Sequence, residues 1–386
     1  MLEPKKSGRD KNMKTQNNPN LKRNLFAMTM IALLMMTILI INRARPAAAL
    51  ADATPFITSY AIPTAGSEPT NIIALGPNQV WFTMQNAHAI GKLVVNGSGQ
   101  GTFTKYNTPT ANSAPYDLAY DGQYIWFTER AGNKIGRLNP ANGAITEYAI
   151  PTANSGPMGI AIAPNGQVWF AQNTSNKMAR FKPASGTFDE YSYTTAGAKP
   201  EDVATSSDES IWFTAPGLKA VIRLLPNKAA SQRFELIPVQ DFNQAPWIPG
   251  RIAVVDNFPE DNPWITAPTK DYVGRYAPGT LGFWRWHVLD HQGTGVNGIF
   301  LQRKGNDYHT WFTEPTGNRA GLLVTNKATN NAVSAYEIPL PGANPRPAGI
   351  TADANGTAWI AAPGTNAILA WRAPYFNKGF MPLILR

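Results

Sequence analysis

The tripeptide Trp-Phe-Thr, or a close variant of it, occurs seven times in this chain and constrains the fold more than any other feature. Its tryptophans are spaced by 45, 43, 43, 52, 47 and 48 residues, at Trp81, Trp126, Trp169, Trp212, Trp264, Trp311 and Trp359. Self-similarity at a period of about 40–50 residues is typical of propellers and solenoids. The repeat therefore outweighs the expectation, from a length of 386 residues alone, of two or three domains.

The repeat over residues 156–193 shows what one unit folds into. Its sequence predicts strands over residues 159–163, 168–171, 177–181 and 187–193, with turn residues between them. The first strand is apolar on both faces, whereas the fourth alternates and is half exposed. Four short strands in a repeat of this length are typical of a propeller blade. We therefore predict an all-β chain that forms a seven-bladed propeller of four-stranded blades.

The two ends of the repeat array predict how the ring closes. Residues 56–63 read as a fourth strand with no blade before it, and the last repeat has only its first three strands. We predict that the N-terminal strand completes the last blade, because closure removes exposed strand edges. The seven tryptophans lie mid-strand. We expect them to pack one blade against the next rather than to form a ring of stacking platforms for bases or sugars.

The composition excludes two classes of site and partner. The chain has no cysteine, which excludes disulfides and thiolate metal sites. The formal net charge is +9, but nine basic and two acidic residues lie within residues 1–51. The rest of the chain then has 25 basic and 23 acidic residues and a net charge of only +2. A net charge this small does not provide the basic surface that binds DNA or RNA, so we expect no nucleic-acid partner.

Residues 1–51 form a separate targeting segment ahead of the propeller, which spans residues 52–386. The run from Leu25 to Ile41 is apolar and uncharged, follows Lys22-Arg23, and precedes small residues at 49–51. This is the order of a secretory signal peptide. The run of 17 residues is also close to a membrane span, so a retained anchor and a buried core helix stay as alternatives. Basic residues before the run place the propeller outside the cytoplasm, with membrane contact only through this segment.

Polar residues that differ between blades gather at one end of the predicted ring. Strands one and two of a blade are antiparallel, so the start of the first and the end of the second lie together near the central channel. We call the residues just before strand one the lead-in of a blade. Variable residues on a constant scaffold are typical of a ligand-binding face, and a solvated loop face is the alternative. The candidate ligand-binding residues at this channel mouth are Glu68, Thr70, Tyr116, Asp117, Glu129, Arg130, Gln172, Glu201, Asp202, Arg251 and Glu314.

Four sub-motifs recur in register and resemble one family. They are x-Pro-x-Gly-Ile, Trp-Phe-Thr-Glu, Asn-Lys-Ile-Gly-Arg and Glu-Tyr-x-Ile-Pro, and they are clearest over residues 113–180. The combination looks like the virginiamycin B lyases, or streptogramin lyases, from residue 56 to about residue 372. The resemblance implies a seven-bladed propeller that opens the ester of a cyclic depsipeptide by elimination. It further implies a histidine base in a Glu-Pro-His element and a magnesium ion held by carboxylates, which stabilises the developing enolate.

The sequence departs from the family pattern at the position of the histidine base. No lead-in carries histidine there, and the residues found instead are Thr70, Tyr116, Met158, Glu201, Gly250, Asn297 and Ala348. Only Glu68-Pro69 keeps the Glu-Pro pair, and threonine is not a competent base at neutral pH. We therefore assign no catalytic residue. Glu129 and Glu314 follow Trp-Phe-Thr in blades two and six, which are not neighbours, so the metal ligands stay unknown.

The four histidines leave a catalytic alternative open. His88 and His291 should lie on the channel-mouth side, either as exposed loop residues or as a displaced base. His287 belongs to an outer strand and His309 to the far end of a second strand, so both read as structural.

Two other metal sites are weaker alternatives. An acidic loop in the longest repeat has oxygen ligands of the kind that calcium takes, at Asp256, Glu260 and Asp261. A metal in the central channel, of the gluconolactonase type, would need a Glu, an Asn and an Asp to converge. Glu68, Asn71, Asp117 and Asp202 could supply them, although no spacing pattern supports such a site.

Three hypotheses for function follow. The first is an exported, monomeric, lyase-like propeller that binds a small molecule or peptide at its channel mouth and lacks the family's base. The second is a magnesium-dependent carbon–oxygen lyase with a relocated histidine base, opening a cyclic depsipeptide or lactone. The third is a structural or adhesive surface module. The apolar tail over residues 380–386 is expected to pack on a blade.

Overall fold

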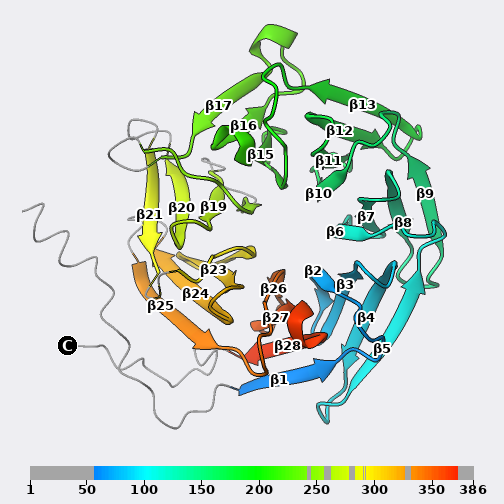
Figure 1. The fold of residues 1–386 in the computed structure, drawn as a ribbon, viewed down its shortest axis with the longest axis vertical. Helices are drawn as coiled ribbons and strands as arrows, with labels where there is room; N and C mark the ends of the chain where they lie inside the picture. Colours follow the sequence, from blue (N-terminus) through cyan, green and yellow to red (C-terminus); the bar gives the residue numbers. More distant parts are fainter. Residues whose placement is uncertain are drawn as a thin grey trace, which may run out of the picture. The chain divides into compact units, whose positions relative to one another are not determined.

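Each Trp-Phe-Thr element is the second strand of a four-stranded antiparallel sheet, and seven such sheets form a ring (Figure 1). This computed structural model describes residues 56–240, 245–255, 262–277, 283–289, 291, 293–326 and 332–372. The prediction of an all-β seven-bladed propeller is thereby confirmed. The predicted targeting segment, the acidic loop over residues 256–261 and the apolar tail lie outside the described residues. In the described part, no helix has the length and apolar character to cross a bilayer.

The first three blades keep the strand lengths expected from the repeat. For residues 156–193 the four observed strands differ from the predicted ones by two residues at most. The strands of blades one to three are β2 (Pro69–Gly76), β3 (Gln79–Met84), β4 (Ala89–Val95), β5 (Gly101–Asn107), β6 (Pro115–Tyr120), β7 (Ile125–Glu129), β8 (Lys134–Leu138), β9 (Ile145–Ala149), β10 (Pro157–Ile162), β11 (Val168–Gln172), β12 (Lys177–Lys182) and β13 (Thr187–Ser192).

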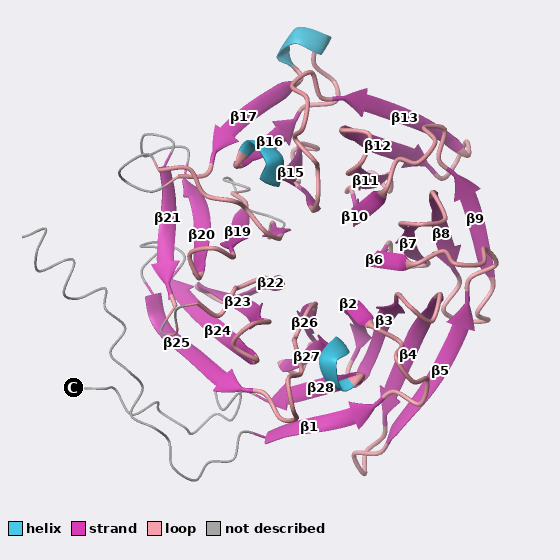
Figure 2. Ribbon diagram, viewed as in Figure 1, coloured by secondary structure: helices cyan, strands magenta, loops and turns pink. Residues whose placement is uncertain are grey.

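Blades four, five and seven have shorter first strands. The later blades also contain three short 3-10 helices, drawn cyan in Figure 2. The helices are η1 (Pro216–Leu218), η2 (Ala230–Gln232) and η3 (Pro363–Thr365). The strands are β14 (Val203–Thr205), β15 (Ile211–Ala215), β16 (Ala220–Leu224), β17 (Phe234–Pro238), β18 (Ile252–Ala253), β19 (Trp264–Ala267), β20 (Tyr272–Ala277), β21 (Phe283–Val288), β22 (Ile299–Lys304), β23 (Asp307–Glu314), β24 (Arg319–Asn326), β25 (Ala332–Pro339), β26 (Ile350–Ala352), β27 (Thr357–Ala362) and β28 (Ala367–Arg372).

The ring closes as predicted. Strand β1 (Phe56–Ala61) pairs antiparallel with β28 from Phe56 opposite Arg372 to Ala61 opposite Ala367, so the N-terminal strand is the outer strand of blade seven. The closure is extended past the strand by Asn366, whose side chain bonds to the backbone at Ile62 and to the hydroxyl of Ser67. Residues about 300 positions apart therefore share one blade.

The core consists of seven hydrophobic clusters, one at each interface between neighbouring blades. Alternate residues of a strand point to opposite faces, so the Trp of each second strand packs into the next blade and the Phe faces the preceding one. Trp126, for example, packs against Ile160 and Phe170 of blade three. The expectation that the tryptophans join blades is confirmed.

The glycine of the Ile-Gly-Arg motif is required by the same phenylalanine. Gly136 on β8 lies opposite Phe127 on β7, and a Cβ added at Gly136 would lie only 2.0 Å from the Phe127 ring. The neighbouring Arg137 lies opposite Trp126, with its guanidinium 5.7 Å from the ring centroid. The glycine and arginine of the third-strand motif thus match the aromatic residues that lie opposite them.

The threonine of Trp-Phe-Thr links neighbouring blades close to the channel. Thr128 accepts the Asp117 N–H at 3.3 Å and donates to the Met158 carbonyl of blade three at 2.6 Å. Blades three and seven have alanine at this position. There, the amides of Gly159 and Gly349 donate directly to carbonyls of the next blade, at 2.9 Å in both cases. Among the described residues, one of these two devices joins six of the seven pairs of neighbouring blades. Between blades four and five, Asp202 accepts the Ile252 amide instead.

Candidate functional site

The first strands lie nearest the centre of the ring (Figure 1). In five blades, the glycine position of the x-Pro-x-Gly-Ile pattern lines a small cavity there. Three blades keep the glycine of the x-Pro-x-Gly-Ile pattern at this position, and four replace it with a polar residue. In order from blade one the residues are Asn71, Asp117, Gly159, Asp202, Arg251, Gly298 and Gly349. The four polar replacements supply the side chains that interact in the channel.

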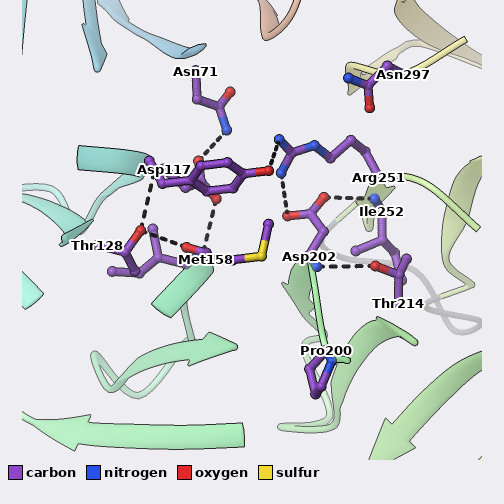
Figure 3. A network of polar contacts seen from close by, with 12 residues as sticks. Asn71, Asp117, Thr128, Met158, Pro200, Asp202, Thr214, Arg251, Ile252 and Asn297 are labelled. Atoms are coloured by element: carbon purple, nitrogen blue, oxygen red, sulfur yellow. Dashed lines mark hydrogen bonds and ion pairs between the residues drawn. The ribbon is translucent and has the colours of Figure 1, made fainter. Parts of the chain in front are cut away.

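Arg251 closes the channel by reaching from blade five to blade two. Its Nη2 donates to the Tyr116 hydroxyl at 2.9 Å, and its guanidinium lies over the Tyr116 ring, 5.1 Å from the centroid. Its Nη1 lies 3.7 Å from Asp202 Oδ1. Figure 3 shows Arg251 directed toward the side chains of Asp117 and Asp202 at the centre of the ring.

Asp117 and Asp202 hold the lead-ins of the blades that follow them. Asp117 accepts the Ile160 amide at 3.0 Å and the Leu118 amide at 2.7 Å, and it also bonds to the Asn71 side-chain amide. Asp202 accepts the Ile252 amide at 2.9 Å. Both carboxylates therefore connect two blades, and Figure 3 shows that they lie on facing sides of the channel.

We call Tyr116, Asp117, Glu201, Asp202 and Arg251 the channel cluster. It contains three acidic side chains and one basic side chain. Burial, and then the charge of Asp202, raise the pKa of Asp117 to about 7, although Arg251 opposes the shift. Burial also raises the pKa of Asp202, again against the effect of Arg251. Glu201 is partly buried beside them, and burial raises its pKa as well. Arg251 lies among these acids, and its positive charge lowers the pKa of each of them.

The channel cluster leaves little free space. A cavity of about 40 Å³ remains, lined by Asn71, Asp202, Arg251, Gly298 and Gly349. This volume suits a few water molecules rather than an organic ligand.

The mouth itself is hollowed over blades one to three. A depression of about 500 Å³ lies between Gln85, Ala114 and Arg130 on one side and Asn154, Gly156 and Thr174 on the other. These residues come from lead-ins and from the ends of second strands, the two places where sequence patterns predicted a ligand-binding face. We call this depression the blade 1–3 hollow.

The candidate residues separate into three groups. Tyr116, Asp117, Glu201, Asp202 and Arg251 meet in the channel. Others lie around it: Glu68 pairs with Arg346 at 3.7 Å, Thr70 bonds to Gln85, and Arg130 lines the blade 1–3 hollow. Glu129, Gln172 and Glu314 are fully buried, and they face the fourth strand of their own blades.

Gln172 shows what these buried residues do. Its amide donates to Glu190 at 2.8 Å, and Glu190 in turn binds Lys177 and Thr152. In blade two the same places are held by Glu129 and Glu147, with Lys134 bonded to Glu147. Burial, and then Glu147, raise the pKa of Glu129 to about 8. At neutral pH Glu129 is therefore protonated and resembles the glutamine of blade three.

The histidines occupy defined positions in the repeat. His88 Nδ1 accepts the Ala114 amide at 3.3 Å, beside the blade 1–3 hollow. His291 Nδ1 pairs with the buried Glu337, whose counterparts Glu147 and Glu190 pair with Thr110 and Thr152. His291 therefore stands where other blades have a threonine.

The remaining two histidines lie away from the mouth. His287 stacks on Trp264 with ring centroids 5.9 Å apart. His309 is buried on β23, and burial, with Lys304 nearby, lowers its pKa to about 4.

The arrangement of the acids does not fit a magnesium ion. Mg²⁺ requires several oxygen ligands in near-octahedral geometry. Asp117 is occupied by two backbone amides and Asn71, and Asp202 by a backbone amide and Arg251. Within the described ranges, no group of three or more acidic or histidine side chains is placed to hold a metal. Asn71, Asp117 and Asp202 do converge in the channel, with an arginine rather than a metal among them.

Arg130 in the lining of the blade 1–3 hollow was among the predicted ligand-binding residues, whereas its other polar members were not. Those other members include Asn154 and Thr174, which lie in turns that repeat with little change in other blades. The pattern that could have revealed the hollow is the size of the residue before the lead-in proline. That residue is alanine or glycine in blades two and three, at Ala114 and Gly156.

Comparison with known proteins is consistent with this geometry. The model of the virginiamycin B lyase family matches residues 45–247. A streptogramin B lyase structure is similar, with 25% identity and a TM-score of 0.68, over 82% of this chain and 97% of that one. A virginiamycin B lyase from Staphylococcus aureus has 26% identity and a TM-score of 0.68, over 82% and 99% of the two chains.

A catalytically inactive variant of the Staphylococcus aureus enzyme, solved with quinupristin, is similar to the same extent, at 25% identity and a TM-score of 0.68 over 82% and 99%. More distant propellers, such as YCF48 bound to a D1 peptide at 12% identity, share the fold alone. Among curated proteins, none matches this sequence.

Proposed function

The chain belongs to the virginiamycin B lyase family, and on this premise we propose that it binds a ligand at its channel mouth without the family's elimination chemistry. The observation that carries the proposal is which residues occupy the lead-ins of the seven blades. None of the seven has a histidine where the resemblance implies the base. The channel behind them is closed by Arg251, Tyr116 and Asp202. What remains open is a polar surface suited to binding.

His88 is a poor replacement for the missing base, although it lies near the mouth. Its Nδ1 accepts the backbone N–H of Ala114, so the neutral ring carries its proton on Nε2. The nitrogen that points away from this bond is then a donor and not a proton acceptor. Acting as a base would require His88 to give up its contact with the blade-two lead-in.

His291 supports a second candidate function, a lyase with a relocated base. Its Nδ1 pairs with Glu337, which leaves Nε2 as the basic nitrogen on a half-exposed ring. The counterpart contacts of Thr110 and Thr152 weigh against this reading, because they show that the position serves to bind the fourth-strand glutamate. The binding role is therefore the leading proposal.

Incubation with quinupristin and magnesium tests both candidates. Chromatography of the antibiotic should show no ring opening above a control without protein. Ring opening that is lost on adding EDTA would contradict the leading proposal. If it occurs, the His291→Ala variant decides the second candidate, which requires that the variant abolish turnover while His88→Ala retains it.

A further inference from the structure

The blade 1–3 hollow exists because two rim residues are small. The residue before the lead-in proline has the same left-handed backbone in blades one, two, four and seven, with φ of 51°, 50°, 52° and 46° at Glu68, Ala114, Lys199 and Arg346. Blade three has Gly156 there, with φ of 60°. Long charged side chains cover the rim in blades one, four and seven. Blades two and three present only a methyl group and a hydrogen.

The lining of the hollow has a defined chemical character. It contains the amide groups of Gln85 and Asn154 and the hydroxyl of Thr174. Asn133 also lines it, but its side-chain amide is bonded to Ile150, Thr152 and Ser155. Arg130 is its one charged side chain, and no carboxylate lines it. The lining therefore favours a ligand with hydrogen-bonding groups and a negative charge over a cationic or purely apolar one.

Arg130 is positioned to bind an anion. It is exposed, and its guanidinium lies 5.7 Å from the centroid of the Tyr116 ring, which Arg251 holds from the channel side. Within the described part of the chain, no hydrogen bond or ion pair is formed by the Arg130 side chain, whereas its backbone N–H donates to the Ala114 carbonyl. Arg130 acts electrostatically on Glu201, but less strongly than Arg251 does. The donors of Arg130 are therefore available above a fixed ring.

We infer that the blade 1–3 hollow binds the free C-terminal carboxylate of a linear peptide, with Arg130 as the anchoring residue. A guanidinium matches a carboxylate with two parallel N–H···O bonds. The amide side chains beside it are suited to the peptide groups that precede such a carboxylate. This inference rests on the proposed function, because it names the ligand chemistry of the same channel mouth.

Calorimetric titration with acetyl-trialanine and with its C-terminal amide tests the inference. The free acid should bind at least tenfold more tightly than the amide. Arg130→Ala should remove this preference and Arg130→Lys should keep part of it, because lysine retains the charge without the bidentate geometry. Arg233→Ala is the matched control, since Arg233 also lies over a tyrosine, 5.1 Å from the Tyr191 ring centroid. It should leave the preference unchanged.

Ala114→Glu provides a second variant that keeps the fold. The same backbone conformation carries Glu68 in blade one, so the turn accepts the change. The new carboxylate should abolish binding of the acid. Equal affinity for acid and amide, or a preference that survives Arg130→Ala, would overturn the inference. A separate titration with quinupristin distinguishes failure of this inference from failure of the proposed function. If quinupristin binds but the acid is not preferred over the amide, only the assignment of the carboxylate site is wrong. If neither quinupristin nor the peptide binds, the proposed function is wrong too.

Discussion

At the scale of single residues, Arg251 decides the character of the channel. Its position holds glycine in blades three, six and seven, where the backbone of the next blade comes close. Arginine fits in blade five because its side chain extends across the channel to Tyr116 and Asp202. It supplies the positive charge that two buried aspartates require. The channel is therefore a structural ion cluster as well as the floor of the mouth.

Replacing Arg251 with methionine should destabilise the propeller by about 3–5 kcal/mol, because two buried carboxylates lose their cation. Urea unfolding at pH 7 measures the change. The double variant Arg251→Met with Asp202→Asn should recover part of the lost free energy of unfolding, since one of the two unpaired buried carboxylates is removed. A single variant as stable as the parent protein would show that Arg251 does not neutralise the cluster.

Glu129 makes stability depend on pH. Its pKa is raised from the ordinary 4.5 to about 8 by burial and by Glu147, so folding favours its protonated form. The stabilising contribution of the protonated form is complete below about pH 4.5 and is lost as pH rises to about 8. Gln172 fills the same place in blade three without titrating.

Glu129→Gln should therefore raise the unfolding midpoint, by little at pH 5 and by more at pH 8. At about 1.4 kcal/mol for each pKa unit, the shift from 4.5 to about 8 makes the gain at pH 8 on the order of 4 kcal/mol. Thermal melts across this range measure it. Gln172→Glu is the converse control and should destabilise increasingly as pH rises. A gain that is equal at all pH values would mean that Glu129 does not titrate in this range.

At the scale of elements, β1 carries the closure of the ring. It forms six residue pairs with β28, and no other described strand lies outside β28 in blade seven. Deleting residues 52–63 should lower the melting temperature far more than deleting residues 373–386, because only the first deletion opens blade seven. Comparable losses from the two deletions would contradict a closing role for β1.

Most elements were predictable from the sequence because each blade repeats the same local pattern. Alternation around Trp-Phe-Thr fixed the second strand, and the unpaired strand at residues 56–63 predicted the closure. The innermost strands were harder, since β14, β18 and β26 have only three, two and three residues. Their lead-ins are held by hydrogen bonds to neighbouring blades, and such contacts leave no periodic pattern.

At the scale of the whole molecule, the ring brings together residues that no local pattern connects. Arg251 and Tyr116 are 135 positions apart and lie in blades five and two, yet they share a hydrogen bond. The sequence located the candidate residues near the mouth, because the repeat places every lead-in there. It could not show which of them meet across the channel or that Glu129 and Gln172 turn away from it.

The seven blades thus provide a rigid mouth whose floor is closed and whose surface is hollowed on one side. Binding at that mouth is the central claim, and hydrogen–deuterium exchange with and without quinupristin tests it most directly. The account predicts slower exchange of amides over residues 114–117 and 130–133, and unchanged exchange in the outer strands β13 and β17. Protection confined to outer strands, or none at all, would contradict it.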